Sequence, residues 1–133
     1  MKAITLWQPY ASLVASGAKP DETRSWRTSY RGPIATHAAI VNPFKAIRPV
    51  SDDTIKVMKN KLRAADMLPP HGDFRYLPRG VIVATATLSE CWKVIEHTPT
   101  AIILKQSNGI GEDKISINAP YLMFGDYSVG RYI

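Results

Sequence analysis

The uncharged run at residues 80–88, GVIVATATL, constrains the fold more than any other stretch of the sequence. It is rich in β-branched residues, which favour strands, and only threonine interrupts its second face. Such a run predicts a buried central strand. The elements expected around it do not alternate as strand–helix–strand units, so a parallel doubly wound sheet is not expected. A small mixed or antiparallel β-barrel that carries two helices fits better.

Two segments have the apolar spacing of helices. Residues 9–16 begin with a proline, carry apolar residues at i, i+3 and i+4, and end before Gly17, which accepts the left-handed conformation. Residues 51–66 begin at Ser51, a typical N-cap, and repeat apolar residues among lysines. The lysine-rich surface of this helix is either a solvated face or an electrostatic guide for a phosphate backbone.

Short strands are expected elsewhere. They cover residues 4–7, 22–27 and 34–39, with 101–105 as a strand or short helix, a hairpin within 106–119 and a β-like run over 126–133. Residues 40–50 and 68–79 are predicted to be loops, because both contain several prolines.

Length and composition exclude several classes of protein. A chain of 133 residues predicts one domain, residues 1–133, that folds without disulfides or metal. The single cysteine, Cys91, is expected to be a buried, inert thiol. The three histidines lack zinc-ligand spacing, and no phosphate-binding glycine loop is present, so no metal or cofactor is expected. No apolar run or signal peptide points to a membrane, and a cytoplasmic location is expected.

The charge is asymmetric along the chain. Seventeen basic and eleven acidic residues give a net charge of +6. The first 67 residues hold 11 basic and 5 acidic residues, whereas the remainder is balanced. Such an excess predicts a polyanionic partner, of which nucleic acid is the usual one. The alternative is that the charge only keeps a small protein soluble.

The densest polar cluster lies between Lys19 and Trp26. In a strand, Glu22, Arg24 and Trp26 would project from one face. Lys19 and Arg24 would then contact phosphates, Glu22 would accept hydrogen bonds from a base edge, and Trp26 would stack on a base. The alternative is a surface ion pair between Glu22 and Arg24, with Trp26 in the core.

Further residues could complete such a pocket. Trp7, Tyr30 and Arg31 would form an aromatic cage with a basic wall if their segments meet, although core packing is the alternative for each aromatic. His37 is either a structural residue or a base that would need a partner within reach.

Several of these residues belong to ordered blocks that resemble an ASCH domain. The blocks are Leu6-Trp7-Gln8-Pro9, Gly17-x-Lys19-x-x-Glu22-x-Arg24, Ser25-Trp26, Tyr30-Arg31-Gly32-Pro33, His37-Ala38, Leu77-Pro78-x-Gly80, Phe124-Gly125-Asp126-Tyr127-Ser128 and Gly130-Arg131-Tyr132. The resemblance implies an α+β, PUA-like fold, which is a small mixed β-barrel with about two helices packed on it. It also implies a domain that binds RNA or a modified nucleotide.

The resemblance carries site residues with it. Lys19, Glu22 and Arg24 line the implied pocket, and Arg131 joins them as an RNA contact. Some similar proteins are hydrolases, so an RNA-directed hydrolase is the alternative function. Its candidate catalytic residues are Lys19, Glu22 and His37, with Tyr127 and Ser128 as further candidates because their hydroxyls, on a loop, could reach a pocket.

Two departures from the family pattern qualify the resemblance. A branch that hydrolyses amides of acetylated cytidine has threonine where Glu22 stands here, which argues against that amidase mechanism. Similar members run on past the Gly-Arg-Tyr block, so a homodimer that covers an open barrel edge is expected. A protein-interaction domain without a nucleic-acid role is the third reading.

Overall fold

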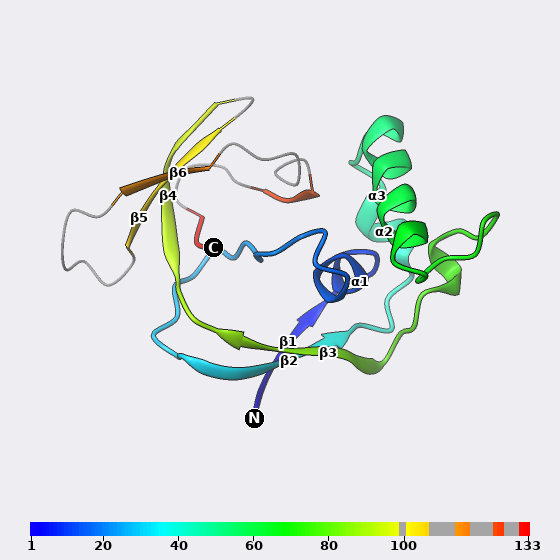
Figure 1. The fold of residues 1–133 in the computed structure, drawn as a ribbon, viewed down its shortest axis with the longest axis horizontal. Coiled ribbons are helices and arrows are strands. Elements are labelled where there is room, and N and C mark those ends of the chain that lie inside the picture. Colours follow the sequence, from blue (N-terminus) through cyan, green and yellow to red (C-terminus); the bar gives the residue numbers. More distant parts are fainter. Residues whose placement is uncertain (99–100, 107–113, 118–123, 127–130) are drawn as a thin grey trace. The chain divides into compact units, whose positions relative to one another are not determined.

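The computed structural model describes residues 1–98, 101–106, 114–117, 124–126 and 131–133 (Figure 1). The chain divides into two compact units. The first unit comprises residues 1–20 and 33–87, and the second comprises residues 21–32 and 88–133. A single domain over residues 1–133 stays a prediction.

The first unit is built on a three-stranded sheet with the order β1-β2-β3 (Figure 1). The strands are β1 (Lys2–Leu6), β2 (Gly32–Ala38) and β3 (Val81–Leu88). β1 and β2 pair in parallel, from Lys2 opposite Ile34 to Leu6 opposite Ala38. The two strands expected near residues 4–7 and 34–39 are therefore confirmed.

β3 confirms a predicted strand but not its predicted burial. Val81 is 47% exposed and Ile82 is 53% exposed, so the run expected at the centre of the sheet lies at its side. The central position belongs to β2, where Ala35, Thr36 and Ala38 are buried. A β-branched sequence predicts an extended backbone, whereas burial depends on which strand has neighbours on both sides.

Both predicted helices are present in the first unit. α1 (Tyr10–Ala15) is followed by Gly17 with a φ of 81°, which is the left-handed conformation that glycine favours. α3 (Asp52–Ala64) begins after Ser51, whose hydroxyl accepts a hydrogen bond of 3.2 Å from the backbone N–H of Thr54. α1 packs against α3, which buries Met58 and Leu62.

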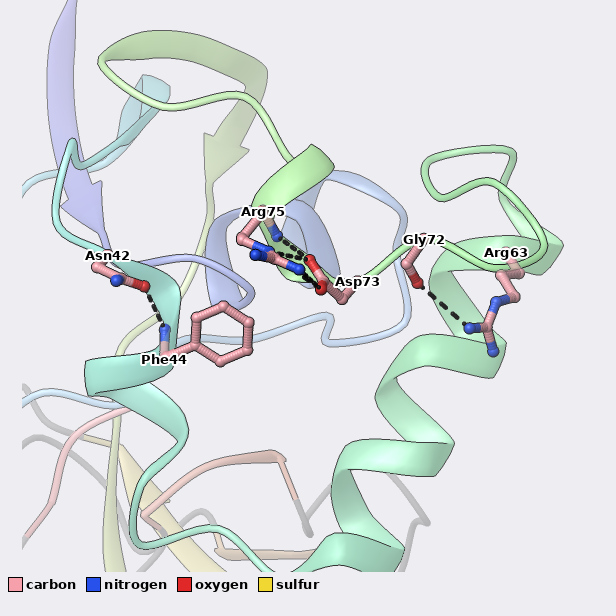
Figure 2. Close-up of polar contacts among 6 residues, drawn as sticks. All are labelled: Asn42, Phe44, Arg63, Gly72, Asp73 and Arg75. Carbon is pink, nitrogen blue, oxygen red and sulfur yellow. Dashed lines mark hydrogen bonds and ion pairs between the residues drawn. The ribbon is translucent and has the colours of Figure 1, made fainter.

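The two predicted loops each contain a short helix. α2 (Pro43–Ile47) begins after Asn42, whose side chain accepts a 3.0 Å hydrogen bond from the backbone N–H of Phe44 (Figure 2). Proline at the first position suits a helix, because its missing N–H would have no partner there. The second is the 3₁₀ helix η1 (Phe74–Tyr76), capped by the Asp73 side chain. Proline content predicted loops here, but capping side chains allowed single helical turns.

η1 carries an ion pair on its first turn. The Asp73 carboxylate accepts hydrogen bonds from the backbone N–H and the guanidinium of Arg75, with a shortest distance of 2.8 Å from Nη2 to Oδ2 (Figure 2). The bonds from the Arg75 side chain and backbone lower the pKa of the Asp73 carboxyl below its ordinary value of 3.8. Because these bonds favour the charged form, the pair stabilises the fold only while Asp73 is ionised.

We expect a corresponding pH dependence of stability. In the unfolded chain Asp73 titrates near 3.8, and in the fold it titrates at a lower pH. Its stabilisation is therefore complete above the unfolded value and is lost as the pH falls through the folded value. Thermal unfolding of the wild type and Asp73→Asn should show a difference in Tm at pH 6 that shrinks at pH 3. A difference that stays constant with pH would contradict this assignment.

The second unit contains an antiparallel sheet with the order β4-β5-β6 (Figure 1). Its strands are β4 (Trp92–His97), β5 (Ile102–Gln106) and β6 (Lys114–Ile117). β5 and β6 pair as a hairpin, from Ile102 opposite Ile117 to Lys105 opposite Lys114, so the segment at 101–105 is the strand rather than the helix of the two alternatives, and the predicted hairpin begins at residue 102 instead of 106. The buried core of this sheet consists of Trp92, Val94, Ile102 and Leu104. β4 was not predicted.

The predicted mixed α+β class is confirmed, because the first sheet contains a parallel pair and the second is antiparallel. Within the described ranges the named strands form two sheets, and a closed barrel is not found. The described chain has α1, α2, α3 and η1 where about two helices were expected. None of the helices in the described part is long and apolar enough to span a membrane.

Candidate nucleic-acid interface

The segment around Arg24 is positioned by the end of the chain. The backbone N–H of Arg24 donates to the carbonyl of Tyr132 at 2.8 Å, and the N–H of Tyr132 donates back at 2.9 Å. Tyr132 also bridges to Lys93 on β4. Arg24 is thereby joined, through Tyr132, to the edge of the second unit's sheet. The predicted strand over residues 22–27 is wrong, because only Arg24 makes this isolated bridge.

Glu22, Arg24 and Trp26 nevertheless come together, and we call them the Arg24 cluster. Nε of Arg24 lies 3.8 Å from Oε1 of Glu22. The guanidinium carbon lies 5.0 Å from the centroid of the Trp26 ring. Trp26 is 57% exposed, so its predicted alternative place in the core is wrong. The cluster presents an indole ring, a cation and a carboxylate on one short segment.

Two further cation contacts lie in the second unit. Nζ of Lys93 lies 5.9 Å from the centroid of the Tyr132 ring. Nη2 of Arg131 lies 2.9 Å from Oδ2 of Asp126, so this predicted RNA contact is already ion-paired. Lys93 was not among the predicted residues, and no local pattern marks it. Its place next to Tyr132 depends on a pairing between residues far apart in the chain.

Tyr30 and Arg31 belong to a locally bonded turn. The backbone N–H of Tyr30 donates to Oγ1 of Thr28 at 3.1 Å. Nη1 of Arg31 donates to the carbonyls of Thr28 at 3.1 Å and Tyr30 at 2.8 Å. Arg31 is exposed and Tyr30 is half-buried, and the Arg31 guanidinium is held against the backbone of its own turn.

Lys19 is buried within the first unit, with 1% of its surface exposed. Its backbone N–H donates to the carbonyl of Leu13 at the end of α1, at 3.1 Å. Glu22 and Arg24 belong to the second unit. The convergence of Lys19 with these two residues on one pocket therefore stays a prediction, as does the cage formed by Trp7 and Tyr30.

Gln8 is completely buried and holds α1 in place. Its Nε2 donates to the carbonyl of Pro78 at 2.7 Å, and its Oε1 accepts from the backbone N–H of Ser12 at 3.0 Å. Both ends of the amide are used, so Gln8 acts as a brace between α1 and the segment that leads into β3. Its neighbour Trp7 is 46% exposed.

His37 has a partner on the adjacent strand. Nδ1 of His37 lies 3.3 Å from Oγ1 of Thr5, its direct neighbour in the pairing of β1 with β2. The ring is half-buried. A hydroxyl beside an imidazole can supply or receive a proton, which keeps both predicted roles of His37 open.

The remaining predicted residues are less informative. Tyr127 and Ser128 lie outside the described residues. Cys91 is a buried free thiol, as predicted. Across the described ranges, no three side chains of His, Cys, Asp or Glu gather as metal ligands.

Comparison with known families gives one match. A family model described as the ASCH domain matches residues 4–106, which is more than three quarters of the chain. The matched range runs from within β1 to the end of β5 and includes the Arg24 cluster. No curated protein matches the chain.

Proposed function

The chain belongs to the ASCH domain family, and on that basis we propose that it binds single-stranded RNA or a modified nucleotide through the Arg24 cluster. RNA binding is the role generally assigned to ASCH domains, which belong to the PUA-like superfamily. The proposal includes the closed PUA-like barrel and the pocket that the Gly-x-Lys-x-x-Glu-x-Arg motif would line.

The observation that carries the proposal is the exposed Trp26 ring beside Arg24. A large indole is costly to expose to water unless a ligand covers it, and every nucleic-acid base offers a face on which it can stack. The Arg24 guanidinium already lies against the ring. A base on Trp26 would thus bring its phosphate near a cation.

The other groups have complementary roles in this proposal. The Glu22 carboxylate accepts hydrogen bonds from a base edge, which gives selectivity rather than affinity. Lys19, Arg31 and Arg131 add positive charge toward the phosphates. A homodimer remains part of the proposal and is independent of the RNA contacts.

Trp26→Ala should weaken RNA binding strongly. Loss of one base–aromatic stack costs about 1–3 kcal/mol, which is about 5- to 150-fold in Kd. The measurement is fluorescence anisotropy with an end-labelled single-stranded RNA of about 12 nucleotides, a length within the range of such sites. Trp26→Phe keeps a stacking ring and should retain most of the affinity.

Arg24→Gln tests the contribution of the Arg24 charge to RNA binding. Removal of this charge should lower the slope of log K for RNA binding against log salt concentration by about 0.7, since one phosphate contact is lost. Arg27→Gln removes the same charge from an exposed neighbour and serves as the control. Equal Kd values for the wild type and Trp26→Ala would contradict the proposal.

A ribonuclease is the second candidate, favoured by the contact between His37 and Thr5. In that mechanism His37 or Glu22 moves a proton and Lys19 stabilises developing negative charge. A denaturing gel of the same RNA distinguishes the two functions. Intact RNA identifies a binding domain, whereas shortened RNA that His37→Gln abolishes identifies a nuclease.

A further inference from the structure

The net charge of the chain resides in one of its two units. The first unit contains ten basic and four acidic residues, whereas the second contains seven of each. The whole excess of +6 therefore belongs to the first unit, while the Arg24 cluster lies in the electrically balanced second unit. The charge that attracts a polyanion from solution and the residues that would read a base thus belong to different units.

Part of this charge forms a stripe on α3. Lys56, Lys59 and Arg63 are spaced three and four residues apart, which places them along one face of the helix. Nζ of Lys59 lies 5.7 Å from the centroid of the buried Phe74 ring in η1. Arg63 donates to the carbonyl of Gly72 at 3.3 Å (Figure 2). The stripe therefore runs beside the segment that carries η1.

η1 adds a cation and an aromatic ring to the stripe. The Arg75 side chain is 71% exposed, yet its guanidinium is held by the Asp73 carboxylate (Figure 2). The same guanidinium lies 5.9 Å from the centroid of the Phe44 ring on α2. The next residue, Tyr76, is 68% exposed. Phe74 stands between Asp73 and Arg75 in the sequence, so the Lys59 ammonium over its ring lies near this pair.

We propose that Lys56, Lys59, Arg75 and Tyr76, named here the α3–η1 patch, bind the phosphate backbone of an RNA strand. The inference rests on the proposed RNA-binding function and adds a second contact surface to it. The occupant follows from charge complementarity, because α3 and η1 together carry five cations, Lys56, Lys59, Lys61, Arg63 and Arg75, against the three carboxylates of Asp52, Asp53 and Asp73. Tyr76 provides a surface on which a base of the same strand can stack.

The geometry of Arg75 distinguishes the patch from an ordinary solvated face. An exposed arginine normally loses side-chain entropy when it binds a phosphate. Asp73 and Phe44 hold the Arg75 guanidinium in place before a ligand arrives, which reduces that loss. Nη1 of Arg75 has no hydrogen-bond acceptor within the described residues, and it remains available to a phosphate oxygen.

The test measures binding of the same labelled RNA over a range of salt concentrations. The double variant Lys59→Gln/Arg75→Gln should lower the salt slope by about 1.4 and weaken binding about 25-fold at about 0.1 M salt. The control, Lys2→Gln/Lys61→Gln, removes two exposed lysines of the same unit. Lys61 lies on the opposite side of α3 from Lys59, since two residues correspond to about 200° around a helix.

A second variant changes the charge beside Arg75. Asp73→Asn keeps the oxygen that caps η1 and removes a negative charge, which favours binding by up to about fivefold, but it also removes the oxygen that holds Nη2 of Arg75, which opposes this gain. A net gain in affinity would support the patch. Circular dichroism confirms that every variant is folded.

The outcomes separate this inference from the proposed function. Equal losses in the patch and control variants would overturn the patch, while Trp26-dependent binding would keep the proposed function. No binding of RNA by the wild type would overturn both. Binding that depends on the patch and not on Trp26 would support the patch and reject the Arg24 cluster.

Discussion

Phe74→Ala should lower the free energy of unfolding by about 3–5 kcal/mol, the usual cost of truncating a buried phenylalanine. The Phe74 ring is completely buried, and η1 packs against α2. Its removal leaves a cavity beneath a helical turn of only three residues, which has few hydrogen bonds of its own. Chemical denaturation monitored by tryptophan fluorescence measures the loss.

Two variants control this result. Tyr76→Ala removes an aromatic ring from the same turn, but that ring is mostly exposed, so stability should change by less than about 0.5 kcal/mol. Phe74→Leu keeps most of the apolar volume and should cost less than the alanine variant. If Phe74→Ala and Tyr76→Ala were equally mild, η1 would not depend on the buried ring.

The second large effect is expected at Gln8. Gln8→Ala should lower the free energy of unfolding by about 2–4 kcal/mol, which combines a small cavity with lost hydrogen bonds. The backbone N–H of Ser12, a buried residue, would lose its acceptor. The carbonyl of Pro78 belongs to an exposed residue and can turn to water, so most of the cost arises at Ser12.

Gln8→Glu separates the two hydrogen bonds. The carboxylate still accepts from Ser12, but its second oxygen would face the carbonyl of Pro78 where an N–H donor now stands. This variant should therefore be destabilised near neutral pH and recover part of its stability in acid, when the carboxyl is protonated. Stability that does not respond to pH would show that the contact with Pro78 is unimportant.

The hydrogen bonds of Gln8 also concern the candidate RNA-binding site, because Lys19 follows the helix that they position. It fixes the first turn of α1, and the end of the same helix holds the backbone of Lys19 through Leu13. A Gln8 variant is therefore expected to shift the backbone of Lys19, and its effect on RNA binding would test the proposed role of Lys19. The Gln in the Leu-Trp-Gln-Pro block is accordingly a structural residue, while its neighbour Trp7 is exposed.

Much of the candidate site followed from spacing alone. Glu22, Arg24 and Trp26 are two residues apart, and they meet as predicted even though no strand forms there. Side chains only two residues apart can meet without a regular strand, and here the chain bends at Ser25 and Trp26. The partner that holds Arg24 was not predictable, because Tyr132 lies more than one hundred residues away.

The α3–η1 patch was likewise only partly predictable from the sequence. The spacing of the lysines on α3 is visible in the sequence, and the helix was predicted with its Ser51 cap. The part of the patch on η1, Arg75 and Tyr76, was not predicted, because residues 68–79 were expected to be a loop. Only the packing of η1 against α2 places Arg75 over the Phe44 ring.

The sequence by itself determined the features that depend on a few neighbouring residues. These are the Ser51 cap, the left-handed Gly17, the β5–β6 hairpin and the gathering of charge in one part of the chain. Only the tertiary structure decided that β2 rather than β3 is central, and that Arg24 joins a sheet edge. Dihedral preferences and caps act within one or two turns of chain, whereas burial and pairing depend on which distant segment occupies the neighbouring place.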